Sequence, residues 1–243
     1  MIRGIEELSL NAWPSLQTMV DDGWVLRFAD GYTRRANSVN PLYPAAKDAG
    51  EKIEACERIY QDKGLNAVFK ITPAVYPENL DTILAARGYT VNAQTSVQIL
   101  NLNNQTLSTS GAVPAEKLTD EWLRAFWEMS GTKPQYHAVH RQMLSNIIPA
   151  TCFASIHQNN QVIACGLGVC QGQFIGLYDI VTHSNFRRQG HGVQLIQNIL
   201  AWGQAQGAQT AYLQVMLNNL PALRLYEKLG FNESYQYWYR IKE

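Results

Sequence analysis

One supersecondary pattern occurs twice in this chain of 243 residues, and it constrains the fold more than any other feature. In the first half, a helix-patterned run ends at Gly64 and is followed by a strand-like run, a second helix and Gly88. The second half repeats this order around Gly207 and Gly230, at nearly the same spacing. The arrangement is common in α/β proteins, but the matched spacing favours an internal duplication. We therefore expect two tandem α/β units.

A polar segment separates the two halves. Residues 101–117, NLNNQTLSTSGAVPAEK, have the Asn, Ser, Thr, Gly and Pro content of a linker or long loop. We predict a first domain over residues 1–100, this linker, and a second domain over residues 118–243. In the second domain Thr119 and Gly131 are typical limits of a helix, and three strands follow it.

Basic and acidic residues balance in this chain, with 20 Lys plus Arg and 20 Asp plus Glu. No charge excess points to nucleic acid or an anionic membrane as a partner. The N-terminus lacks the apolar core of a signal peptide, and no apolar run could span a bilayer, so we expect a cytoplasmic protein. Zinc-site spacing is absent among the four cysteines, which are Cys56, Cys152, Cys165 and Cys170. We expect no metal, and reduced, buried thiols at Cys165 and Cys170.

A basic, glycine-containing turn, NFRRQGHG, lies between an apolar strand-like run and a helix-patterned run. The first N–H groups of a helix lack intrahelical acceptors, and the helix dipole favours an anion there. Gly190 and Gly192 let an anion approach the backbone closely, while Arg187 and Arg188 supply positive charge. The turn therefore predicts an anion-binding site.

Acidic residues are absent from the whole stretch between Asp179 and Glu227. A free helix usually favours an acid in its first turn, so the empty place favours a phosphate. A Walker P-loop is excluded because no GxxxxGK followed by Ser or Thr occurs. A dinucleotide-binding turn is excluded because its third glycine and its ribose-binding acid are missing. Residues 187–192 match a third pattern, in which Arg or Gln, two residues, Gly, one residue, and Gly or Ala form a pyrophosphate loop.

This loop and a second motif resemble those of the GNAT N-acetyltransferase superfamily. The family motif NxxAxxLYxxxGF is similar to NLPALRLYEKLGF in this chain, and six residues carry the match: Asn219, Ala222, Leu225, Tyr226, Gly230 and Phe231. The resemblance spans residue 118 to the C-terminus. In the first half the corresponding turn lacks glycines, and Leu84 stands where Tyr226 does, so this half looks like a degenerate copy.

The resemblance implies an α/β (α+β) fold with a mixed, mostly antiparallel sheet flanked by helices. It also implies acetyl-CoA, or a related acyl-CoA, as co-substrate, and transfer of the acyl group, foremost acetyl, to a primary amine by direct attack through a tetrahedral intermediate. The pyrophosphate would lie against Arg187, Arg188, Gln189, Gly190, His191, Gly192 and Val193. The pantetheine arm would run beside Ile180 and Val181, on a strand that splays from its neighbour in the family. Asn219 would contact the cofactor or only cap its helix.

The amine must lose a proton in this chemistry, because a free alkyl amine has a pKa of about 10.4 and is charged at neutral pH. Family members often place a Glu or His on the strand before the loop, but Leu177 and Ile175 occupy those positions here. Asp179 is the only acid on that strand, and alternation puts it on one face with Leu177 and Val181. We predict that Asp179 is the base, a substrate contact or a hydrogen-bonded structural carboxylate. A water-mediated route also remains open.

The departing thiolate needs a proton, and Tyr226 is the candidate donor. The alternative is that its ring only packs beneath its helix. The acceptor would enter over the loop after the first helix of the second half, where Tyr136, His137 and His140 either line the entrance or belong to an ordinary polar loop. The sequence does not separate a small-molecule amine from a peptide N-terminus or a lysine, or a monomer from a homodimer. A catalytically idle CoA-binding sensor or regulatory module is the alternative function, and a nucleotide-binding regulator is a weaker third.

Overall fold

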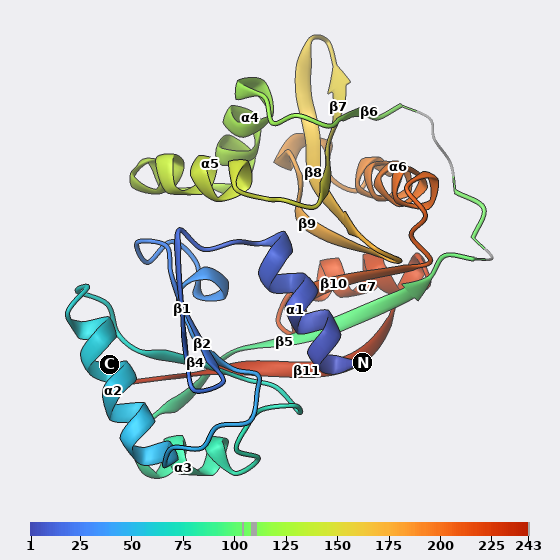
Figure 1. Ribbon diagram of the computed structural model, residues 1–243. Helices are drawn as coiled ribbons and strands as arrows, with labels where there is room; N and C mark the ends of the chain where they lie inside the picture. The colour runs from blue at the N-terminus through green and yellow to red at the C-terminus, as the bar shows by residue number, and fades with distance from the viewer. Residues whose placement is uncertain (104, 108–110, 243) are drawn as a thin grey trace. The chain divides into compact units, whose positions relative to one another are not determined.

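The computed structural model describes residues 1–103, 105–107 and 111–242 (Figure 1). They form two compact units. The first comprises residues 1–97, 216–218 and 234–243, and the second comprises residues 98–215 and 219–233. The last ten residues thus group with the first unit. From the sequence we predict a first domain over residues 1–100, a linker over 101–117 and a second domain over 118–243, and these functional limits stay a prediction.

The first unit is a sheet with three α-helices. Its neighbouring strands are, in order, β1 (Gln17–Asp21), β2 (Trp24–Phe28), β3 (Val39–Pro41), β4 (Val68–Ile71) and the C-terminal part of β11 (Asn232–Ile241). Its helices are α1 (Ile2–Ala12), α2 (Ala49–Gln61) and α3 (Leu80–Ala86), with the 3-10 turn η1 (Arg34–Ala36). Only the pairing of β3 with β4 is parallel among those that the structure describes here.

A buried ion pair lies inside the first unit. Lys70 Nζ donates to the carboxylate of Glu6, and the Tyr235 hydroxyl donates to the other oxygen of Glu6 at 2.7 Å. Glu6 is fully buried and Lys70 nearly so. Because both charges are paired and hydrogen-bonded, the desolvation penalty of each is offset.

The second unit holds the other half of the strands. Their order is β10 (Thr210–Met216), β9 (Phe174–Thr182), β8 (Gln161–Gln171), β7 (Ala150–Gln158) and β6 (Val113–Ala115). β10 and β9 are parallel, and the remaining neighbours in this series are antiparallel. The helical elements are α4 (Asp120–Ser130), η2 (Pro134–Tyr136), α5 (His137–Ser145), η3 (Ser184–Phe186), α6 (His191–Ala205) and α7 (Leu220–Lys228). Strand β5 (Thr90–Asn101) has residues in both units. The expected mixed, mostly antiparallel sheet flanked by helices is confirmed.

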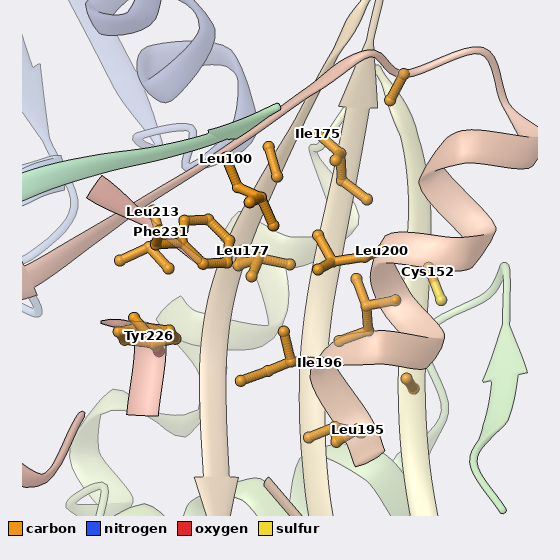
Figure 2. Packing of buried hydrophobic residues seen from close by; sticks show 14 of the residues in the cluster. Leu100, Cys152, Ile175, Leu177, Leu195, Ile196, Leu200, Leu213, Tyr226 and Phe231 are labelled. Carbon is orange, nitrogen blue, oxygen red and sulfur yellow. The ribbon is translucent and has the colours of Figure 1, made fainter. Parts of the chain in front are cut away.

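Helices cover both faces of the second unit's sheet (Figure 1). On one face α6 packs so closely on β8 that a side chain at Gly168 of β8 would overlap Ile199 of α6. Figure 2 shows the apolar side chains of α6 packed against those of the strands. On the other face, Trp122 of α4 donates its indole N–H to the Ala154 carbonyl at 3.1 Å, and its ring lies edge-on to Phe153. Coverage on both sides explains why β8 is apolar along most of its length.

The predicted repeat is present as a succession of elements: α2, β4, α3 and β5 in the first half, and α6, β10, α7 and β11 in the second. All four glycines that mark it have a left-handed backbone, with φ of 68° at Gly64, 86° at Gly88, 93° at Gly207 and 88° at Gly230. Residues with a Cβ rarely adopt this conformation, so glycine ends each helix.

The local limits of α4 also follow the prediction. The Thr119 side chain accepts a hydrogen bond from the Trp122 amide, and Gly131 closes the helix with a φ of 69°. All four cysteines are buried and free of disulfide bonds, as expected for Cys165 and Cys170. Among the residues described, no helix combines the length and the apolar character needed to cross a membrane.

Candidate active site

Strand β9 departs from regular pairing at Asp179. Its described pairing with β10 ends at Leu177. Its pairing with β8 shifts between Tyr178 and Val181, where β9 has one residue more than β8. Asp179 itself has a φ of 51°, which is rare for a residue other than glycine. The end of β9 is therefore a β-bulge, and its backbone diverges from the β10 ladder, as the family resemblance implies.

The bulge changes the alternation of side chains along β9 and so changes which of them face α6. Ile175 lies against Gly203 of α6, and Ile180 reaches the space beside Gly166, next to Leu195 and Ile199 of the same helix. Residues five positions apart face opposite sides of a regular strand, so the extra residue lies between them. Leu177 belongs to the cluster on the α6 side, whereas Asp179 bonds to α5. The expectation that Asp179 shares a face with Leu177 is therefore wrong, because a bulge interrupts the alternation.

The start of α6 has the features of an anion site. No side chain of the described residues caps this helix, and no acid lies in its first turn. Gly190 at the N-cap has a φ of 89°, and no described residue beyond its chain neighbours lies within 4 Å of where its side chain would be. Arg188 has a φ of 62°, and its side chain has no hydrogen bond or ion pair within the described part of the chain. Amide groups in such a turn point outward together and, with the helix dipole, attract an anion.

The other residues of the predicted loop have contacts of their own. Arg187 Nε donates to the Thr182 carbonyl at 3.2 Å, and Gln189 Nε2 donates to the Asn185 carbonyl at 3.1 Å, so both side chains brace the turn. The ring of His191 lies edge-on to that of Phe186. A side chain at Gly192 would make ordinary contacts with Leu225 and Thr182. The loop thus has room for a ligand mainly at Arg188, Gly190 and the first amides of α6.

The helix that corresponds to α6 in the first unit begins differently. Asp48 caps α2, and its carboxylate accepts from the Gly50 amide at 2.8 Å and from the Glu51 amide at 3.2 Å. Glu51 adds a second acid in the first turn. The Asp48 carboxylate satisfies two of the N–H groups, and both acids would repel a phosphate.

Tyr226 lies on α7 at the border of the apolar cluster, beside Phe231 (Figure 2). Burial raises the pKa of its phenol to about 12. Its hydroxyl has no hydrogen-bond partner among the residues described. The group is therefore a protonated, unengaged donor at neutral pH. Asn219 accepts from the Ala222 amide at 3.3 Å, so it does cap α7, and its contact with a cofactor stays a prediction.

A second cluster joins α4, α5 and β9. Trp127 Nε1 donates to His140 Nδ1 at 2.9 Å, and His140 Nε2 lies 3.0 Å from Asp179 Oδ2. His137 stacks on the Trp127 indole with ring centroids 3.9 Å apart, and its Nε2 contacts the Thr132 carbonyl. His140 is completely buried, so it does not line an entrance as a free polar residue.

The link between His140 and Asp179 was not found from the sequence. The two residues are 39 positions apart, and nothing local pairs them. A helical stripe did hold a signal, because Val139, Met143 and Leu144 are buried with His140 on one side of α5. Among the described residues, no group of three or more His, Cys, Asp or Glu could hold a metal ion.

Known proteins match this chain along its whole length. The family model described as "Probable histone acetyltransferase Rv0428c C-terminal" matches residues 1–240. The "Uncharacterized N-acetyltransferase YobR" of Bacillus subtilis (strain 168) is 30% identical over 247 residues, covering 99% of this chain and 98% of that protein.

Two solved structures share the fold. A GCN5-related N-acetyltransferase from Kribbella flavida has a TM-score of 0.70 at 16% identity, over 99% of this chain and 95% of that one. A tandem GNAT protein from the clavulanic acid biosynthesis pathway has a TM-score of 0.66 at 12% identity, over 98% of this chain and 87% of that one. The predicted resemblance is confirmed: the chain belongs to the Rv0428c C-terminal acetyltransferase family, and it is an N-acetyltransferase of the GNAT superfamily.

Proposed function

We propose that this protein transfers an acetyl group from acetyl-CoA to a primary amine, with its one working site in the second unit. The observation that carries the proposal is the uncapped start of α6 beside the bulged end of β9. The first feature suits a pyrophosphate, and the second leaves strand backbone for the amides of a pantetheine arm. Acetyl-CoA carries both groups and supplies the reactive thioester.

The turn and the strand end would hold the cofactor. The amides from Arg188 to Val193 face the pyrophosphate in this proposal, and the Arg188 guanidinium adds charge and forked donors. The open space at Gly190 supports close approach of the backbone to the phosphates. Ile180 in the bulge and Val181 after it would lie along the pantetheine arm.

Two side chains would handle the protons. Asp179 would accept a proton from the ammonium group of the acceptor, because an alkyl amine with a pKa of about 10.4 arrives charged. The Tyr226 hydroxyl would face the departing sulfur. Its pKa of about 12 lies above that of a free thiol, so the phenol stays protonated and its contribution begins as a hydrogen bond to the developing thiolate.

The acceptor class follows from the chemistry and is a primary amine, whether on a small molecule, a peptide N-terminus or a lysine. We propose a cytoplasmic monomer or homodimer that needs neither nucleic acid nor a membrane. The rival proposal is an idle CoA-binding module, and it differs in one outcome: it binds acetyl-CoA but transfers no acetyl group.

The test combines binding and turnover. A panel of amines is incubated with protein and acetyl-CoA, and thiol release is followed with a thiol reagent. Calorimetry measures acetyl-CoA affinity for the wild type, Gly190→Trp and Gly207→Trp. The two glycines have similar backbones, with φ of 89° and 93°, and open surroundings, but they lie at opposite ends of α6.

The proposal expects Gly190→Trp to bind acetyl-CoA about tenfold or more weakly, and Gly207→Trp to bind as the wild type does. Unchanged affinity in Gly190→Trp would remove the loop from the site. Binding without thiol release for any amine would favour the idle module.

A further inference from the structure

A chain of two hydrogen bonds ends on the proposed base. Trp127 of α4 donates to His140 of α5 at 2.9 Å, and His140 contacts Asp179 of β9 at 3.0 Å. Three separate elements of the second unit meet here. The middle residue has no exposed surface, and the Asp179 side chain keeps only 8% of its area exposed.

The chemistry of Trp127 fixes the direction of both bonds. An indole N–H can only donate, so Nδ1 of His140 must accept and carries no proton. A neutral imidazole has one proton, which must then be on Nε2. Nε2–H therefore donates to Oδ2 of Asp179. A second proton on Nδ1 would abolish the bond from Trp127.

Asp179 has one oxygen left for a substrate. Its bond to His140 is the only one it makes within the described residues, which leaves Oδ1 without a partner. Oδ1 is also absent from the buried polar atoms that lack a partner, so it is not sealed off from solvent. The carboxylate is thus clamped at one oxygen and open at the other.

The backbone supports the same interpretation. Asp179 has a φ of 51° and lies in the bulge directly before Ile180 and Val181, the residues proposed to follow the pantetheine arm. Strained backbone at a residue other than glycine persists where the surroundings impose it, and it concentrates at functional sites.

We propose that His140 is a positioning residue, whose tautomer Trp127 fixes and whose Nε2–H orients Asp179 so that Oδ1 receives the proton of the acceptor ammonium group. This inference rests on the proposed function. The amine nitrogen loses a proton to Oδ1 and uses its freed electron pair to form the bond to the thioester carbon. The carbon–sulfur bond then breaks, and the thiolate gains a proton with the help of Tyr226. The second nitrogen proton and the proton on Asp179 pass to solvent, and solvent returns one proton to the sulfur by way of Tyr226. Amine cation and thioester thus become amide, thiol and one released proton.

The first test is spectroscopic and needs no activity. Nitrogen-15 NMR of the histidine rings should show His140 with a proton on Nε2 and a bare Nδ1. Trp127→Phe keeps a ring for His137 to stack on but removes the donor, so the nitrogen-15 shift of Nδ1 should change as it loses its hydrogen bond, while the proton stays on Nε2 beside Asp179. Trp122→Phe is the matched control, because Trp122 is on the same helix and its indole N–H bonds to the Ala154 carbonyl instead. A proton on Nδ1 in the wild type would overturn the proposal.

The second test is kinetic. Asp179→Asn should lower kcat about 10²–10⁴-fold, the range of general base assistance. His140→Leu removes the donor and should lower kcat while leaving the KM for acetyl-CoA within about twofold. His140→Gln places an amide N–H near the position of Nε2, so it should recover part of that loss. Trp127→Phe should lower kcat more than Trp122→Phe does, with thermal midpoints measured for all variants.

The outcomes separate the two proposals. Equal losses in Trp127→Phe and Trp122→Phe, or an unchanged kcat in Asp179→Asn, would overturn the positioning role and leave the acetyl transfer standing. If the wild type acetylates no amine, the proposed function fails and this role with it, whatever the NMR shows of the hydrogen bonds.

Discussion

Replacing Tyr226 with Phe isolates a single hydroxyl group. The ring remains, with its centroid 5.8 Å from that of Phe231. The hydroxyl has no hydrogen-bond partner to lose within the described residues. The free energy of unfolding should therefore change by about 0.5 kcal/mol or less. If the hydroxyl assists the departing sulfur, kcat should fall about 10²–10⁴-fold, which is on the order of 3–5 kcal/mol of transition-state stabilisation. Because burial raises the pKa of the phenol to about 12 and makes it a weaker acid, we expect the lower end of that range.

The assay measures kcat and the KM for acetyl-CoA by thiol release, and stability by denaturant unfolding. The loss should appear in kcat, with KM nearly unchanged, because the hydroxyl matters mainly in the transition state. An active wild type with an equally active Tyr226→Phe would refute this role and leave the thiolate to depart unaided or with water. A large drop in stability would instead show that the hydroxyl has a structural partner.

Three further predictions concern the first unit. Titration should give one acetyl-CoA per chain, because Asp48 and Glu51 occupy the start of α2; a stoichiometry of two would refute the degenerate interpretation. Hydrogen bonds from two backbone amides lower the pKa of the Asp22 carboxyl to about 2, below the value of about 3.9 in the unfolded chain. The charged carboxylate therefore stabilises the fold above about pH 3.9, and this contribution is lost as the pH falls toward 2. Asp22→Asn should therefore lower the thermal midpoint at pH 7 and flatten its decline in acid, and an unchanged curve would contradict this. Lys70→Met leaves Glu6 buried without its ion partner and should cost about 3–5 kcal/mol in urea unfolding, whereas a loss below about 1 kcal/mol would mean that the Tyr235 hydroxyl suffices.

Features set by neighbouring residues along the chain could be predicted. Thr119 caps α4 and Asn219 caps α7 because their side chains reach amides three residues ahead. Gly131 and Gly230 end helices because a left-handed backbone excludes most other residues. The absence of acids at the start of α6 led to the prediction of an anion site there, and the described residues provide no side-chain cap for that helix.

Features set by pairing partners could not be predicted. The bulge at Asp179 exists only relative to β8, so strand alternation alone put the carboxylate on the wrong face. The bond between His140 and Asp179 depends on how α5 packs on the sheet. The helical stripe of α5 indicates that His140 faces inward, but it does not indicate which residue His140 meets. The C-terminal part of β11 pairs with β4, which no local pattern in residues 234–243 indicates.

The bulge decides which of two neighbouring side chains, Asp179 or Ile180, faces α6. In a regular strand Asp179 would face α6, and its charge would lie among Leu195, Ile199 and other apolar groups. Burying an unpaired carboxylate there costs several kcal/mol, whereas a strained backbone at one residue costs roughly 1–3 kcal/mol. The bulge therefore lowers the free energy of the folded state relative to a regular strand. It does so because it turns Ile180 toward α6 and the Asp179 carboxylate toward His140. The same distortion ends the pairing with β10, so the step that gives Asp179 its partner also frees the strand backbone proposed to meet the cofactor.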